Sequence, residues 1–168
     1  MRIVGLIFAV ALLACVGVCT GHDGYTEPSE SEVLDLLSET QNSWQSFRPL
    51  LARQKNLLVK SGAESPQKAV IVTYSLDIAV PMFKNQPLRF NSPEGFLLVE
   101  WLFDASRESA ICARTASIQA RKMFDSRQPE LANDFDRLGE SCSDSSVELY
   151  KVAQNASTLF LRHLKAKQ

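Results

Sequence analysis

The stretch that decides the fold runs from Cys112 to Cys142, "CARTASIQARKMFDSRQPELANDFDRLGESC". Pro129 suits the first position of a helix, so the pattern predicts two helices joined by a tight turn near Arg127. Cys112 lies 15 residues before Arg127, and Cys142 lies 15 residues after it. Because residues equidistant from the turn lie opposite one another in an antiparallel helical hairpin, the two cysteines are expected to meet.

The same rule brings together pairs of residues that are mostly apolar on both sides. These pairs are Leu98 with Ala156, Leu102 with Val152, Ala105 with Leu149, Ser109 with Ser145, Ala116 with Leu138, and Met123 with Leu131. The cysteine pairing and the hydrophobic pairing share one register, so we expect a disulfide between Cys112 and Cys142. A catalytic thiol would need a neighbouring base, and a zinc site would need more ligands than two thiols and one helical histidine supply, so neither is expected.

The first 21 residues have the pattern of a secretory signal peptide, with one arginine, an apolar run that begins at Ile3, and small residues at the end. Cleavage after Cys19 and cleavage after Gly21 both fit this pattern. A less favoured alternative takes "LLAC", ending at Cys15, as a bacterial lipoprotein box, although the residues that follow are apolar rather than polar. We therefore expect a secreted, extracellular protein, in which a disulfide is stable.

The composition argues against several classes of function. The 18 Lys and Arg residues nearly balance the 19 Asp and Glu residues, whereas a dedicated nucleic-acid binder has a basic excess. After the signal peptide, no apolar stretch is long enough for stable insertion in a membrane. The chain has no glycine-rich phosphate loop, no serine nucleophile elbow, no HExxH motif and no EF-hand spacing. We expect no enzyme activity, no catalytic residues, no metal and no cofactor.

After residues 1–21 and a flexible leader at 22–30, the sequence predicts one helical domain at 31–168. The expected helices are 31–60, 66–84, 93–126 and 129–165. Residues 69–80 favour a strand by propensity, but a strand would have no partner, so a buried helix is preferred. The predicted fold is an all-α, antiparallel up-down four-helix bundle, with the third and fourth helices joined by one disulfide.

Two helices carry further signals. Ser29 and Glu32 have the spacing of a capping box, which begins the first helix. Pro49 is expected to kink or split that helix, and the segment from Gly139 to Ser146 is a weak point of the fourth. The apolar or near-apolar stripe of the first helix is Val33, Leu37, Thr40, Trp44, Phe47, Leu51, Gln54 and Leu58.

One edge of the third helix carries an arginine at every seventh position, opposite the side that meets the fourth helix. The arginines are Arg107, Arg114 and Arg121, and Phe96, Phe103, Ile111 and Ile118 fall within about 40° of them at 100° per residue. Two interpretations are open. In the simpler one, the apolar members pack on the first two helices while the arginine stems reach outward. In the other, this face is exposed and binds a partner, because arginine and aromatic residues are frequent anchors at interfaces.

We therefore expect a secreted, non-enzymatic binding protein that acts on an extracellular macromolecule. The candidate contacts are the leader and the third-helix face, with Arg107, Arg114, Arg121, Phe103, Ile111 and Ile118. The alternative is a carrier of a small apolar ligand or lipid within the bundle, because the seam between the last two helices is rich in alanine and serine. Asn155 begins the triplet "NAS", an acceptor for N-glycosylation in a eukaryotic secreted chain.

Overall fold

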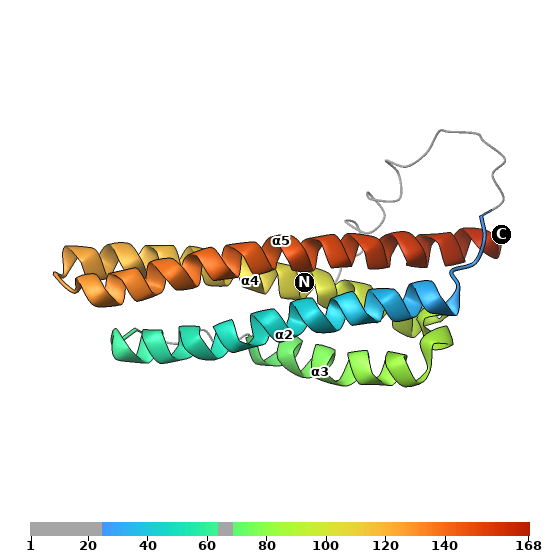
Figure 1. The fold of residues 1–168 in the computed structure, drawn as a ribbon, viewed down its shortest axis with the longest axis horizontal. Helices are drawn as coiled ribbons and strands as arrows, with labels where there is room; N and C mark the ends of the chain where they lie inside the picture. Colours follow the sequence, from blue (N-terminus) through green and yellow to red (C-terminus); the bar gives the residue numbers. More distant parts are fainter. Residues whose placement is uncertain (1–24, 64–68) are drawn as a thin grey trace, which may run out of the picture.

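The computed structural model describes residues 25–63 and 69–168, and these are almost entirely helical (Figure 1). The elements are α2 (Glu30–Lys60), α3 (Ala69–Asn85), the 3₁₀ helix η1 (Pro87–Asn91), α4 (Pro93–Asp125) and α5 (Pro129–Ala166). The predicted all-α class is confirmed, and each of the four expected helices is present. The predicted signal peptide at 1–21, the start of the leader at 22–24, and residues 66–68 lie outside the described residues.

The capping box predicted for the first helix is present. Ser29 Oγ accepts a hydrogen bond from the backbone N–H of Glu32 at 3.3 Å, and Glu32 Oε2 accepts from the backbone N–H of Ser29 at 2.8 Å. α2 continues through Pro49 without a break, so the prediction that Pro49 splits this helix is wrong. Of the predicted stripe, every position except Leu51 is buried, and this packing holds the helix together on both sides of the proline.

Residues 69–85 form α3, so the strand alternative for 69–80 is wrong. The described residues contain no strand that could pair with this segment, and a helix satisfies its own backbone groups. Pro81 lies inside α3, which continues to Asn85. Leu76 and Phe83 are fully buried against the core, which explains the apolar character of this segment.

The turn between α4 and α5 falls at Arg127, as predicted. The backbone N–H of Gln128 donates to the carbonyl of Met123 at 2.9 Å, and that of Arg127 donates to the carbonyl of Phe124 at 3.0 Å. This is the Schellman arrangement that ends a helix, and it places Arg127 in the left-handed region with φ of 59°. The turn therefore reverses the chain within a few residues.

Arg127→Gly is expected to stabilise the protein by about 1 kcal/mol, because a side chain at positive φ is strained and glycine is not. Gly62, with φ of 70°, already occupies the equivalent position at the end of α2. Urea unfolding of both proteins measures the difference. Ser126→Gly is the control, since Ser126 has φ of −86° and gains nothing from glycine. An Arg127→Gly protein less stable than the wild type would contradict the strain argument.

The disulfide predicted between Cys112 and Cys142 joins α4 to α5, with the two Cα atoms 5.9 Å apart. Next to it, Ser109 Oγ donates to the carbonyl of Cys142 at 2.7 Å. Ser106 and Ser146 each donate a hydroxyl to the other's backbone carbonyl at 3.0 Å. All the residues that the turn rule paired are buried, except Leu131, which is half-buried. The small residues thus let the two helices approach closely.

α2 lies along α5, and α3 packs beside α2 and α4 (Figure 1). Along the contact between α2 and α5, residue numbers rise on one helix as they fall on the other. The polar pairs are Glu32 with Arg162 at 2.6 Å, Glu39 with Asn155 at 3.4 Å, and Arg53 with Asp134 at 3.6 Å. One hydrophobic core contains residues of α2, α3, η1, α4 and α5.

Residues 25–29, the described part of the predicted leader, lie against the C-terminal end of α5. Glu27 Oε1 lies 2.9 Å from Nδ1 of His163, a side chain that is buried. Lys165 Nζ lies 4.4 Å from the centre of the Tyr25 ring, within reach of a cation–π contact. This part of the leader therefore has defined partners on α5.

Glu32 links α2 to α5 and is expected to make stability depend on pH. The hydrogen bond from Arg162, with the backbone and hydroxyl donors of Ser29, lowers the pKa of Glu32 from 4.5 to about 2. A depressed folded-state pKa means that the stabilisation is complete above pH 4.5 and is lost as pH falls towards 2. Glu32→Gln, which still caps the helix, should therefore lower the melting temperature most above pH 4.5.

Thermal unfolding of the wild type and of Glu32→Gln between pH 7 and pH 2 measures this dependence. The difference in melting temperature should shrink as the pH falls, and a difference that stays constant would show that the carboxylate charge contributes nothing. Glu30→Gln is a suitable control, because Glu30 is an exposed carboxylate in the same helical turn and makes no ion pair with α5 among the described residues.

Candidate functional site

The third-helix face predicted from the arginines is exposed. Arg107, Arg114 and Arg121 are exposed on α4, and Ile111 and Ile118 between them are 42% and 47% exposed. We call these five residues the arginine–isoleucine stripe. Phe103, the sixth predicted contact residue, is 36% exposed at the N-terminal end of the stripe, and Phe96 beyond it is 47% exposed. All six predicted contact residues thus lie along one accessible face.

The simpler interpretation, in which Phe103, Ile111 and Ile118 pack on the first two helices, is wrong. α2 makes most of its contact with α5 and little with α4, and α3 is 17 residues long against 33 for α4. Phe103, Ile111 and Ile118, on the side of α4 opposite its seam with α5, are all exposed among the described residues. The residues on the seam itself, such as Leu102 and Ala105, are the ones that supply the core.

The three arginines lack ion-pair partners among the described residues. In the part of the chain that the structure describes, none of them takes part in an ion pair or a side-chain hydrogen bond, although Asp104 and Glu108 are near in sequence on the same helix. Other arginines of the described chain do have such partners, among them Arg162 with Glu32. The stripe therefore presents three available guanidinium groups, each able to bind a carboxylate through two parallel hydrogen bonds.

The aromatic end of this face includes residues of α5. The ring of Tyr150 meets that of Phe103 edge to face, with centroids 5.9 Å apart, and Tyr150 is itself about half exposed. Val147, one turn before Tyr150, is 54% exposed. The rings of Phe96 and Phe160 also lie together, with their centroids 6.1 Å apart. The accessible face thus combines an apolar end with an arginine-bearing end.

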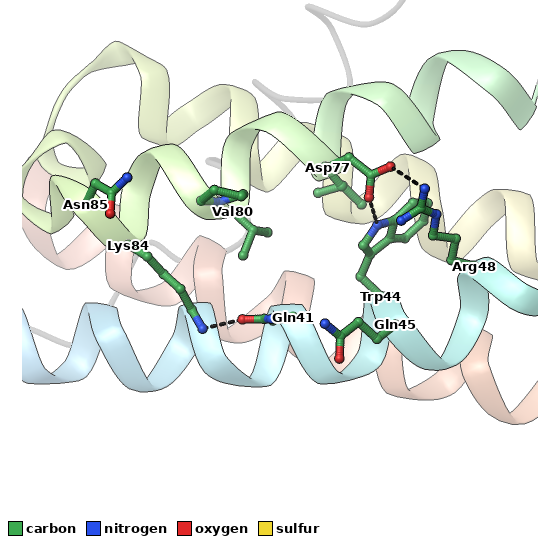
Figure 2. Close-up of a pocket in the computed structure, with 10 residues that line it drawn as sticks. Gln41, Trp44, Gln45, Arg48, Asp77, Val80, Lys84 and Asn85 are labelled. Carbon is green, nitrogen blue, oxygen red and sulfur yellow. Dashed lines mark hydrogen bonds and ion pairs between the residues drawn. The ribbon is translucent and has the colours of Figure 1, made fainter.

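A pocket of about 350 Å³ lies between α2 and α3, and several of its polar side chains are paired with one another (Figure 2). Asp77 accepts a hydrogen bond from the indole Nε1 of Trp44 at 2.9 Å and lies 3.3 Å from Arg48. Lys84 donates to Gln41 across the same groove, as Figure 2 shows. These contacts fasten α3 to α2, and the ammonium group of Lys84 has a neutral amide rather than a carboxylate as its partner.

A second surface pocket of about 300 Å³ lies between α2 and α5. It is acidic, with Glu32, Asp35 and Glu39 on its α2 side, and Asn155 on its α5 side. Two of these carboxylates already have partners on α5, as described above. In the described residues, no group of three or more His, Cys, Asp or Glu side chains is arranged to hold a metal ion.

The sequence pattern located the α4 face but not its neighbours. Tyr150 could have been found, because the turn rule places residue 151 opposite Phe103. The hydrogen bond between Trp44 and Asp77 could not have been predicted, because no turn or cysteine pair fixes the register of α2 against α3. The contact of Glu27 with His163 joins segments 136 residues apart in the chain, and no local signal predicts it.

No protein-family model matches this chain, and neither the curated proteins nor the solved structures include a match to it. Among the helices of the described residues, none combines the length and the apolar character that crossing a membrane requires.

Proposed function

We propose that this protein is a secreted, non-enzymatic binding protein that acts on an extracellular macromolecule through the exposed face of α4. The observation that carries the proposal is the arginine–isoleucine stripe, in which three arginines with no ion-pair partner in the described part of the chain alternate with two half-exposed isoleucines. Arginine and aromatic residues are enriched at protein interfaces, and on this face they stand together with exposed isoleucines. Tyr150 and Phe103 extend this surface onto α5.

The architecture that we propose for this function is a single antiparallel up-down four-helix bundle. The opposite order of the polar pairs on α2 and α5, together with the turn at Arg127, supports it. In such a bundle the disulfide of Cys112 and Cys142 stiffens the half of the hairpin that carries the stripe. A rigid platform favours binding because little conformational entropy is lost when a partner docks.

Chemical cross-linking in the native extracellular fluid, followed by mass spectrometry, tests the proposal. The wild type should give a defined cross-linked partner, and a variant carrying Arg107→Glu, Arg114→Glu and Arg121→Glu should lose it. A variant carrying Lys55→Glu, Lys60→Glu and Lys167→Glu is the matched control, because it reverses three exposed charges away from both the stripe and Tyr150. If both variants keep the same partner, the α4 face is not the binding site.

The second candidate function is a carrier of a small apolar ligand or lipid, and native mass spectrometry of the secreted protein tests it. The alanine-rich seam that suggested it is tightly closed by the Ser109–Cys142 hydrogen bond and the disulfide. A co-purified lipid or pigment would favour the carrier. A single mass equal to that of the polypeptide, with or without glycan, would count against it.

We propose that residues 1–21 direct secretion and that Asn155 is glycosylated in a eukaryotic host. Asn155 is exposed on α5 and makes one long hydrogen bond, 3.4 Å to Glu39. Protein secreted from eukaryotic cells should lose mass on treatment with an amidase that removes N-glycans, and Asn155→Gln should lack this change. An unchanged mass would exclude the modification in that host.

A further inference from the structure

We propose that the arginine–isoleucine stripe binds an amphipathic helix of another protein, in which apolar residues alternate with carboxylates at heptad spacing. This inference deepens the proposed function, on which it rests, by naming the chemistry of the partner. It is carried by the spacing of the five stripe residues, by their exposure, and by the lack of ion-pair partners for the three arginines among the described residues.

The spacing of the stripe is that of a helix-packing seam. Its members lie at 107, 111, 114, 118 and 121, so successive steps are four, three, four and three residues. A 4-3 spacing keeps side chains in line along a helix and lets them interdigitate with those of a second helix. Over these positions α4 rises about 21 Å, which corresponds to two full heptads of contact. The opposite side of α4 uses the same kind of seam for α5, with Ala105, Ser109, Cys112 and Ala116.

The charge of the stripe specifies the partner's polar residues. Packing a helix against Arg107, Arg114 and Arg121 removes water from three guanidinium groups, and each then needs an anionic acceptor. No described carboxylate of this chain is bonded to any of them. Because the arginines recur every seven residues, the facing carboxylates must recur with the same period, with apolar residues between them to cover Ile111 and Ile118.

Other occupants fit the stripe less well. A second copy of this chain could dock by its own stripe, with the two α4 helices antiparallel and Arg114 at the centre of the contact. Arg107 would then face Arg121, and Arg114 would face Arg114 of the other copy. Such a contact is unfavourable because like charges repel. A sulfated polysaccharide or an anionic lipid surface would satisfy the arginines, but the polysaccharide would leave Ile111 and Ile118 uncovered. A lipid surface is approached by helices whose cations flank the apolar stripe, whereas here the cations lie within it.

The test uses the full secreted protein and a pair of synthetic helical peptides about three heptads long. Each heptad of a peptide has two positions that face the stripe. In one peptide, leucine fills the first of these positions and glutamate the second. In the other peptide, lysine replaces each glutamate. Fluorescence anisotropy measures binding of each labelled peptide. The wild type should bind the glutamate peptide and reject the lysine peptide, with a difference in Kd of about a hundredfold or more, because like charges across an interface are strongly unfavourable.

The decisive variant carries Arg107→Glu, Arg114→Glu and Arg121→Glu and should exchange this preference, binding the lysine peptide in place of the glutamate peptide. The control with Lys55→Glu, Lys60→Glu and Lys167→Glu should keep the wild-type preference, which excludes an effect of net charge alone. Arg→Gln at the three stripe positions should weaken glutamate-peptide binding without creating lysine-peptide binding, and it provides a second readout if charge reversal disturbs folding. Ile111→Ser with Ile118→Ser should weaken peptide binding by about tenfold.

Three outcomes would overturn the inference. The first is absence of binding to the glutamate peptide at about 1 mM, the limit of weak recognition. The second is binding of heparin fragments or anionic vesicles that depends on the arginines but is unaffected by Ile111→Ser and Ile118→Ser. Such a result would mean that the stripe binds polyanions. The third is concentration-dependent dimerisation of the wild type that is lost in the stripe variants. None of these would by itself refute the proposed function, which fails only if the native partner is independent of the stripe.

Discussion

Replacing Cys112 and Cys142 together by alanine is expected to lower the free energy of unfolding by about 3–4 kcal/mol. The disulfide closes a loop with a sequence separation of 30 residues, and in the chain-entropy model opening a loop of that length gives the unfolded chain this much extra freedom. Denaturant unfolding of the double variant and of the wild type measures the effect. For a domain of this size, the loss is a large share of the whole stability.

Two measurements separate the cross-link from the packing of its sulfur atoms. The wild type unfolded in the presence of a reductant should be destabilised nearly as much as the double alanine variant, because both lack the bond. Thiol titration of the denatured, unreduced protein, in a chain lacking residues 1–21, should detect no free thiol. Equal stability with and without reductant, or two free thiols, would contradict the structural role of this bond.

Gly95→Ala is expected to destabilise the protein by about 3 kcal/mol, because η1 passes directly against the first turn of α4. A Cβ atom at position 95 would lie 1.9 Å from the carbonyl oxygen of Phe90 and 2.8 Å from its carbonyl carbon. Both are backbone atoms and cannot rotate away, so the backbone of η1 or of α4 must shift. Phe90 is fully buried and contacts the rings of Phe83 and Phe160, so this shift would disturb the core.

Gly139→Ala provides the matched control for this prediction. The Cβ atom added at position 139 would approach Ala113 and Ala116 no closer than 3.6 Å, an ordinary van der Waals contact. Alanine also has the higher helix propensity, so this variant should be neutral or more stable by up to about 1 kcal/mol. Denaturant unfolding of both variants should give opposite signs. A Gly95→Ala protein as stable as the wild type would show that the backbone there yields easily.

Local patterns predicted much of the helical structure. The Ser29 and Glu32 spacing located the start of α2, and the turn at Arg127 located the end of α4 and the start of α5. These features act over a few residues, so the sequence displays them directly. The prediction that Pro49 splits the first helix was wrong for the opposite reason, and the same reason kept local propensity from favouring the helix that residues 69–80 form. Packing against distant segments keeps α2 continuous and makes α3 a helix, and local propensity contains no information about that packing.

By itself, the sequence determined that α4 and α5 meet through Cys112 and Cys142. A single turn joins the two helices, and the two cysteines are equally distant from it. The sequence also placed Arg107, Arg114 and Arg121 with their apolar neighbours on one edge of α4, because helical periodicity does so without any tertiary contact. Only the tertiary structure decided that this edge is exposed. Whether Ile111 and Ile118 belong to the core or to the surface depends on where α2 and α3 pack. α2 packs on α5, and that contact is made by side chains from distant parts of the chain. The free energy of packing is a property of all four helices together, and no single stretch of sequence contains it.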